Sequence, residues 1–212
     1  AWRLADPGAA FRTETDLTTT PAGTDAEATR KDIIEATFRL LSDRRFEEVT
    51  IRAIAQEAGV SLSTLYAHFS SRGHILAGFT KDSDRAVLAG NFADMADEHP
   101  RDRLFDVLMA RLDALVPYRL GIGELLRAAR RDGALALGLN ALSMQSLAWM
   151  MAAADLSVSG WKGRVAVQSL SIAFANVLRV FADEDDPGMP LTMAKLDSEL
   201  RGLEARHKRF AR

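Results

Sequence analysis

Residues 50–69 read TIRAIAQEAGVSLSTLYAHF, and the spacing of their apolar residues predicts two short helices joined by a tight turn. Thr50 is placed to cap the first helix with its hydroxyl. Gly59 supplies the positive φ with which a helix commonly ends, and Val60 fills the corner. The expected buried face of the first helix has four members at helical spacing: Ile51, Ile54, Ala55 and Ala58.

The second helix of this stretch is predicted to present small polar residues to solvent. Ser61 is its expected cap, and Leu65 and Phe69, four residues apart, point inward. The outward positions are Ser63, Thr64, Tyr66, Ala67 and His68. A short exposed helix with such residues suits the major groove of DNA, where they reach base edges and phosphates. The pattern therefore indicates a helix-turn-helix.

Charge supports this interpretation. No Asp or Glu occurs between Ala58 and Lys81, in a chain that carries 29 acidic residues against 27 Lys and Arg. Such a gap is expected of a surface that approaches phosphates. The net charge of −2 argues against bulk electrostatic attraction to DNA, so the polarity comes from placement. The competing interpretation is an ordinary helical hairpin whose turn contains glycine.

The flanking segments favour the DNA-binding interpretation. Residues Thr29–Leu41 form an amphipathic helix, and Phe46 follows where it can cover a small core. After Phe69, the sequence SSRGHIL starts another helix, with Ser70 or Ser71 as its cap. The expected inner positions of the first helix are Ile33, Ile34, Thr37, Leu40 and Leu41.

Over roughly residues 25–80, the order TR-x-x-I-I-x-A-(x)4-L, then F-(x)3-T-I-R-x-I-A-(x)2-A-G-V-S-(x)3-L-Y-x-H-F-(x)2-R, resembles the TetR family of bacterial transcriptional regulators. The resemblance implies an all-α homodimer with an N-terminal DNA-binding domain and a larger C-terminal domain that binds a small molecule and dimerises. Arg72 falls where the family usually has a phosphate-binding Lys. The other DNA contacts that the resemblance implies are Thr50, Arg52, Ser61, Ser63, Thr64, Tyr66 and His68.

Three positions depart from the family pattern. Ser63 stands where Gly is common, so its hydroxyl adds a contact or restricts the approach of the helix. Arg45 stands where a helix-ending Gly is usual, which predicts a strained or differently shaped first turn. Gly73 replaces a common acidic residue and loosens the start of the next helix. These departures affect the operator sequence that would be bound and leave the apolar framework unchanged.

Composition and pattern divide the chain into three parts. Residues 1–23 lack sustained periodicity and are expected to form a flexible arm, or alternatively an arm whose Arg3 and Arg12 reach a minor groove. Residues 24–71 form the helix-turn-helix domain, and residues 72–212 form the helical ligand-binding and dimerisation domain. Helices in the latter are expected over Arg72–Asp97, Arg101–Val116, Gly121–Arg131, Ala134–Ala154 and Val165–Phe181, and from Thr192 onward.

The segment Ala134–Ala154 has 21 consecutive uncharged residues, long enough to span a membrane. Its Ala content and its interruption by Asn140 and several Ser residues favour a central helix of a bundle instead. An apolar or amphipathic ligand is expected to bind in this bundle, although the same side chains can simply fill the core. The predicted ligand contacts are Phe105, Met109, Met144 and Trp149.

The last two helices are expected to pair with those of a second copy. In the final helix, Leu196, Leu200 and Leu203 recur at i, i+4 and i+7, a spacing that suits an isologous four-helix interface. In such a dimer, the two DNA-contacting helices would lie about 34–36 Å apart, one DNA turn. A swing of the helix Arg72–Asp97 would change that spacing when the ligand binds. Gly73, Gly78 and Gly90 are expected either to ease this motion or to serve as packing positions.

An enzymatic function is not expected. The four histidines (His68, His74, His99 and His207) are scattered, and nucleophile and nucleotide-binding motifs are absent from the sequence. No metal or other cofactor is therefore predicted. The absence of Cys fits a cytoplasmic protein. Two functions remain open: a repressor released from operator DNA by a small molecule, or a lipid- or small-molecule-binding protein of the same fold that does not regulate DNA.

Overall fold

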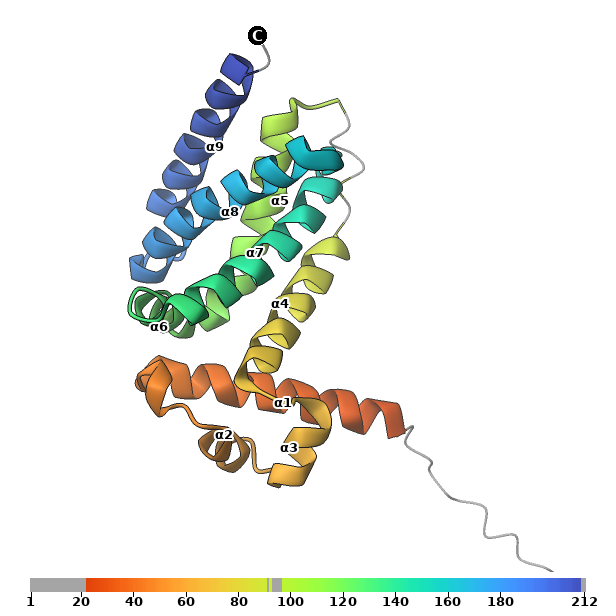
Figure 1. The fold of residues 1–212 in the computed structure, drawn as a ribbon, viewed down its shortest axis with the longest axis vertical. Coiled ribbons are helices and arrows are strands. Elements are labelled where there is room, and N and C mark those ends of the chain that lie inside the picture. The colour runs from red at the N-terminus through yellow and green to blue at the C-terminus, as the bar shows by residue number, and fades with distance from the viewer. Residues whose placement is uncertain (1–21, 91, 93–96, 211–212) are drawn as a thin grey trace, which may run out of the picture.

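The computed structural model describes residues 22–90, 92 and 97–210, and all regular elements in these ranges are helical (Figure 1). The N-terminal elements are α1 (Ala22–Asp43), η1 (Phe46–Glu48), α2 (Ile51–Glu57), α3 (Leu62–His68) and α4 (Arg72–Leu88). The remaining elements are α5 (Pro100–Leu115), η3 (Val116–Tyr118), α6 (Arg119–Ala129), α7 (Gly133–Ala153), α8 (Gly160–Asp183) and α9 (Pro190–Phe210). The predicted all-α fold is confirmed.

Helices α1, α2 and α3 form a small unit at one end of the molecule (Figure 1). All five predicted inner positions of α1 are buried, as are Ile54, Ala55, Leu65 and Phe69. Gly59 has φ +67°, which confirms the predicted left-handed turn between α2 and α3. Helix α1 begins at Ala22, so it is longer than predicted. Residues 1–21 of the predicted arm lie outside the described residues.

The turn after α1 is not strained. Arg45 has φ −67° and ψ 146°, ordinary extended values. Among the described residues other than glycine, only Asp155 and Met189 have positive φ. The expectation of strain at Arg45 is therefore wrong, because the chain leaves α1 through extended backbone that any residue adopts.

Helix α4 is shorter than predicted. It ends at Leu88, where the N–H of Ala89 donates to the carbonyl of Arg85 and that of Gly90 donates to Val87. These bonds close the last turn, so Gly90 lies beyond the helix and not within it. Gly78 is a close-packing position, since a Cβ there would lie 2.8 Å from Cε1 of Phe69. A flexible α4 with glycine hinges at 78 and 90 is therefore not supported.

Helices α5 to α9 form the bundle, and α4 packs both on α1 and on α5 and α7. The α6 helix packs against α1 so closely that a Cβ at Gly121 would lie 2.7 Å from Cδ1 of Phe38. Helix α4 therefore runs from the N-terminal unit into the bundle, and α6 forms a second contact between them (Figure 1).

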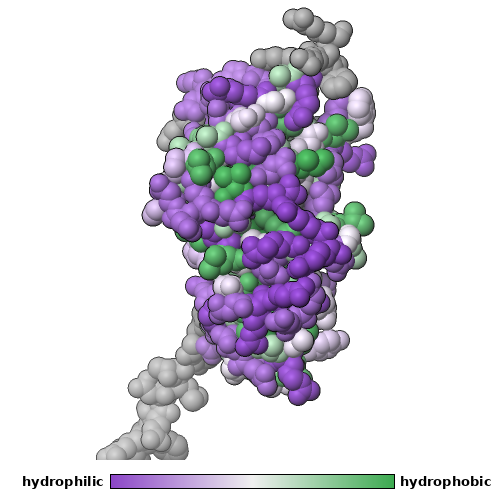
Figure 2. Space-filling model, turned by 90° about the vertical axis from the view of Figure 1, so that its left-hand side faces the viewer, coloured by the Kyte–Doolittle hydropathy of each residue, from purple (hydrophilic) through white to green (hydrophobic). Residues whose placement is uncertain are grey.

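The leucine row of α9 is directed into its own protomer. Leu196 and Leu200 are 1% and 3% exposed, in a helix that packs on α8 and α5. Figure 2 shows the side of the molecule on which α9 and α6 lie, and this face is mainly hydrophilic with small, separate hydrophobic patches. Leu196 and Leu200 are therefore not available for the predicted contact with a second copy, because the folded chain already buries them.

Helices α7 and α8 are long and apolar enough to cross a membrane by length and composition alone. Their polar residues nevertheless bond to neighbouring helices. Asn140 and Gln168 exchange amide hydrogen bonds of 3.2 Å, and Ser171 Oγ donates to Ser143 Oγ over 3.0 Å. These contacts agree with the prediction that Ala134–Ala154 is a helix of a bundle.

Candidate nucleic-acid interface and internal cavity

Both helices of the helix-turn-helix begin with a hydroxyl cap. Thr50 Oγ1 accepts the N–H of Ala53 at 3.1 Å, and Ser61 Oγ accepts the N–H of Thr64 at 3.0 Å. The Ser61 hydroxyl also lies 2.7 Å from that of Ser63. Each cap satisfies a backbone donor that has no partner within the helix. The caps therefore fix where α2 and α3 begin.

The predicted contact residues gather on α3 and on the start of α2, at the end of the molecule away from the bundle (Figure 1). Tyr66 is 72% exposed, and the Leu65 side chain beside it is 1% exposed. Thr64 and His68 are half-buried. The exposed predicted contacts are Thr50, Arg52, Ser61, Ser63 and Tyr66. One surface thus brings together hydroxyl, phenol and guanidinium groups.

The acidic residues at the two borders of the acid-free segment are paired with arginines. Glu57 Oε1 accepts from Arg39 Nε at 3.0 Å, and Asp82 is paired with Arg30. Each pair offsets the negative charge that would otherwise repel phosphates from the edge of the surface. The acid-free segment is therefore bordered by acidic residues whose charges are already paired.

Arg72 is directed toward its own domain. Its Nη1 donates to the carbonyls of Phe46 at 2.8 Å and Val49 at 3.2 Å, and its guanidinium lies 4.2 Å from the centre of the Phe46 ring. These contacts tie the segment before α2 to the first residue of α4. The phosphate contact from Arg72 stays a prediction, because the guanidinium in this conformation is occupied by backbone carbonyls.

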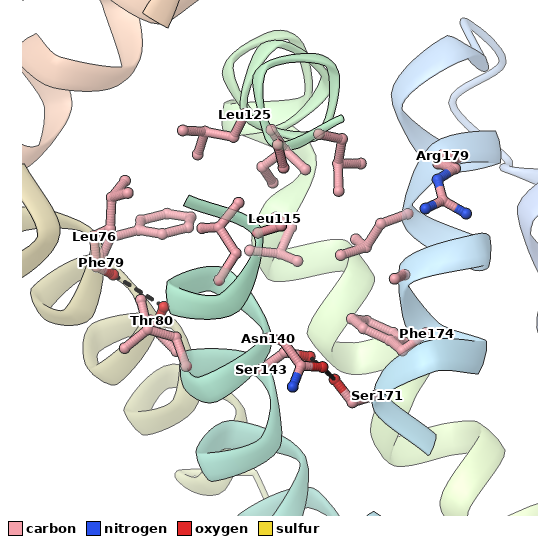
Figure 3. Close-up of a pocket in the computed structure, with 18 of the residues that line it drawn as sticks. Leu76, Phe79, Thr80, Leu115, Leu125, Asn140, Ser143, Ser171, Phe174 and Arg179 are labelled. Carbon is pink, nitrogen blue, oxygen red and sulfur yellow. Dashed lines mark hydrogen bonds between the residues drawn. The ribbon is translucent and has the colours of Figure 1, made fainter. Parts of the chain in front are cut away.

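A cavity of about 350 Å³ lies inside the bundle, at the lower end of the usual size of small-molecule sites (Figure 3). Its wall is mostly aliphatic and aromatic, and α4, α5, α6, α7 and α8 all contribute to it. The lining residues are Leu76, Phe79, Thr80, Arg111, Leu115, Ile122, Leu125, Leu126, Ala129, Arg130, Ala136, Leu139, Asn140, Leu142, Ser143, Ser171, Phe174, Ala175, Leu178 and Arg179.

None of the four predicted ligand contacts lines this cavity. Phe105, Met109 and Met144 are half-buried against the core, and Trp149 is 58% exposed. Helix α7 is apolar on all sides, so its sequence does not indicate which face lines a cavity. The missed signal was Arg111, a basic residue of α5 that stands between the apolar residues Ala110 and Leu112.

A buried ion pair stands beside the cavity. Arg111 of α5 donates through Nη1 to Asp84 of α4, and Ser146 of α7 donates to the same carboxylate at 2.6 Å. Burial lowers the pKa of Arg111, although the neighbouring Asp84 opposes this shift. Three helices are thus joined by one carboxylate at the side of the cavity.

The expectation that the protein binds no metal and catalyses no reaction stays a prediction. No group of three or more His, Cys, Asp or Glu among the described residues is placed to hold a metal ion. His74 Nδ1 lies 2.7 Å from Ser70 Oγ, and His99 Nδ1 accepts the N–H of Arg101 at 3.3 Å, as a helix cap. The side chain of His207 is outside the description.

Sequence comparison with known proteins also identifies the helix-turn-helix. Residues 33–78 match the family model for bacterial regulatory proteins of the tetR family. The HTH-type transcriptional regulator PksA of Bacillus subtilis is 34% identical over 91 residues, which cover 42% of this chain and 44% of PksA. The HTH-type transcriptional repressor KstR of Mycolicibacterium smegmatis is 38% identical over 69 residues, 29% of this chain and 34% of KstR. The chain thus matches less than half the length of these curated relatives.

Solved structures share the fold over most of the chain. A TetR transcriptional regulator from Nitrosomonas europaea has a TM-score of 0.64 at 17% identity, and the match covers 84% of this chain and 98% of that one. A TetR transcriptional regulator from Rhodococcus sp. RHA1 has a TM-score of 0.57 at 19% identity, covering 84% and 97%. In sequence, the N-terminal helix-turn-helix segment of this chain belongs to the tetR family of bacterial regulatory proteins, and the described chain shares the fold of solved TetR regulators.

Proposed function

We propose that this protein is a sequence-specific DNA-binding transcriptional regulator, a cytoplasmic homodimer that represses its target until a small apolar or amphipathic ligand releases it from the operator. The observation that carries the proposal is the exposed, acid-free surface of α3, with Tyr66 72% exposed at its centre. The name of KstR, a repressor, favours repression. Residues 24–71 would bind DNA and residues 72–212 the ligand and the second copy.

Dimerisation is proposed to use the exposed apolar residues of α8. Trp161, Val165 and Ile172 are 68%, 55% and 58% exposed, and they recur on one side of the helix at i, i+4 and i+11. An isolated chain gains nothing by exposing such a row to water, whereas a symmetric contact buries it twice. Of the two helices in the predicted interface, this proposal retains α8. It leaves out Leu196 and Leu200 of α9, because the protomer itself buries them.

Ligand control is proposed to act through α4. This helix begins four residues after α3 ends, and its Leu76, Phe79 and Thr80 line the cavity. One turn beyond Thr80, Asp84 is bonded to α5 and α7. A ligand releases DNA only if it binds the incompetent arrangement of the dimer more tightly than the competent one, in which the two α3 helices lie about 34–36 Å apart.

Tyr66 provides the test of DNA binding. We expect its ring to contact the sugar-phosphate backbone or a thymine methyl, so Tyr66→Ala should weaken operator binding by about 1–3 kcal/mol and leave the fold intact. Fluorescence anisotropy with the intergenic DNA beside its own gene measures the affinity, and circular dichroism checks the fold.

Leu120→Ala is the matched control, because Leu120 is 61% exposed but belongs to α6. It should leave DNA affinity unchanged. If Tyr66→Ala and Leu120→Ala both bind DNA like the parent protein, the assignment of α3 is wrong. If the parent protein binds apolar ligands but no DNA, the protein is instead a lipid- or small-molecule-binding member of this fold.

A further inference from the structure

The wall of the internal cavity is unusual in its charge. Three of its 20 lining residues are arginines, at positions 111, 130 and 179, and none of the 20 is Asp or Glu. An apolar compartment ordinarily excludes charged side chains unless they are paired or reach water. The chemistry of each arginine therefore indicates what the cavity accommodates.

Arg111 is already neutralised. Its side chain is 7% exposed and is paired with Asp84, so this end of the cavity presents no net charge. Asn140, Ser143 and Ser171 are likewise occupied with one another, since Ser171 Oγ lies within hydrogen-bond distance of both Asn140 Oδ1 (3.2 Å) and Ser143 Oγ (3.0 Å) (Figure 3). The inner wall therefore offers chiefly apolar contact to an occupant.

Arg130 and Arg179 differ from Arg111. Both line the cavity and are also solvent-exposed, which places them where the cavity meets water. Neither forms an ion pair with a carboxylate of the described residues. Arg179 Nη1 donates only to the neutral Asn176 Oδ1, at 2.6 Å. In Figure 3, Arg179 lies on α8 beyond Phe174, which belongs to the apolar wall. The cavity wall thus carries two exposed arginines that form no ion pair with an acidic side chain among the described residues.

We propose that the ligand is an amphipathic organic anion, whose apolar body fills the cavity and whose carboxylate is bound by Arg130 and Arg179. Guanidinium groups pair with carboxylates through two parallel hydrogen bonds. A cationic ligand would be repelled by the same residues. This inference rests on the proposed ligand control and adds the chemical class of the ligand.

Three probes of equal chain length test the charge requirement: decanoate, decanol and decylamine. Isothermal titration calorimetry with the DNA-free full chain should give at least tenfold tighter binding for decanoate than for decanol, and no binding of decylamine. The double variant Arg130→Gln/Arg179→Gln should weaken decanoate binding at least tenfold and leave decanol binding unchanged. Equal affinities of decanoate and decanol, or binding of none of the three probes, would overturn the proposal.

The matched control is Arg164→Gln, which removes an exposed arginine of the same helix α8 that does not line the cavity. It should bind decanoate as the parent chain does. A loss of decanoate affinity equal to that of the double variant would show a general effect of net charge and overturn the proposed site. Glutamine at exposed positions keeps the helices intact, and circular dichroism verifies this.

DNA release is measured separately, so that the two proposals fail independently. If decanoate binds as expected but leaves DNA affinity unchanged, the anion site is supported and the ligand control proposed above is wrong. If decanol releases DNA as effectively as decanoate does, the ligand control is supported and the anion requirement is wrong.

Discussion

The two ends of the molecule expose opposite kinds of surface. Tyr66 on α3 and Trp161 on α8 are exposed to nearly the same extent, 72% and 68%. Tyr66 shares α3 with Ser63 and Thr64 and with Leu62, which is 47% exposed, whereas Trp161 shares its side of α8 with Val165 and Ile172. A polar, acid-free surface suits phosphates, and an apolar one suits another protein surface. One helical chain thus presents two exposed surfaces of different chemistry.

Their interiors differ as well. The core of the α1–α3 unit is apolar, and its ion pairs, such as Arg39–Glu57, lie at the surface. The bundle instead buries Asp84 and Arg111 next to a cavity. Buried charges and empty volume both reduce stability. We infer that a ligand filling the cavity would stabilise the bundle more than a ligand could stabilise the α1–α3 unit.

The largest expected effect concerns this buried pair. Arg111→Ala leaves the Asp84 carboxylate buried without a compensating charge, so the free energy of unfolding should fall by about 3–5 kcal/mol. Urea denaturation of the parent chain and of Arg111→Ala measures this change in the free energy of unfolding. Arg201→Ala, which breaks the exposed pair with Asp197, is the control and should cost less than about 1 kcal/mol.

The double variant Asp84→Asn/Arg111→Met tests the reason for that loss. It removes both charges and should recover most of the stability lost in Arg111→Ala. Equal costs for Arg111→Ala and Arg201→Ala would show that the buried pair does not distinguish the bundle from the surface.

A smaller effect is expected in the DNA-binding unit. Arg72→Ala removes two hydrogen bonds to backbone carbonyls and the stacking on Phe46, and should cost about 1–3 kcal/mol of unfolding free energy. If Arg72 also contacts a phosphate, the variant should weaken specific and nonspecific DNA binding alike and lower the salt slope by about one unit. A lower stability with an unchanged salt slope would limit Arg72 to its structural role.

The smallest effect is expected at the start of α9. The Glu184 carboxylate accepts hydrogen bonds from the N–H groups of Leu191 and Thr192, both at 2.8 Å, and from the Thr192 hydroxyl. Burial alone would raise the pKa of Glu184, but these bonds and the charge of Arg119 together lower it. The stabilisation is therefore present above the ordinary pKa of Glu and is lost as the pH falls through the lowered pKa.

Urea denaturation at a series of pH values compares the parent chain with Glu184→Gln. The variant should be less stable by on the order of 1 kcal/mol at neutral pH, and the difference should shrink in acid. If the difference in stability does not change with pH, the charge of Glu184 contributes nothing to the stability of the folded chain.

Local rules explain why the α1–α3 unit was predictable from sequence and the cavity was not. Thr50, Gly59 and Ser61 act through bonds within a few residues, and the α1 core follows a helical period. The direction of the Arg72 side chain depends on the carbonyl of Phe46, 26 residues away. The cavity combines five helices, and the pairing of Arg111 with Asp84 spans 27 residues. Neither is visible in a periodic pattern.

Ala67→Glu tests the function of α3 most directly. It places an acid on the exposed surface of α3, and the control Ala134→Glu makes the same change in the exposed first turn of α7. Both should fold, since an acid is favourable at a helix N-terminus and Ala67 buries no side chain. At low salt, anisotropy with the DNA beside its own gene should show at least tenfold weaker binding for Ala67→Glu and parent-like binding for Ala134→Glu. Equal affinities of the two variants would contradict the assignment of α3 as the DNA-binding helix.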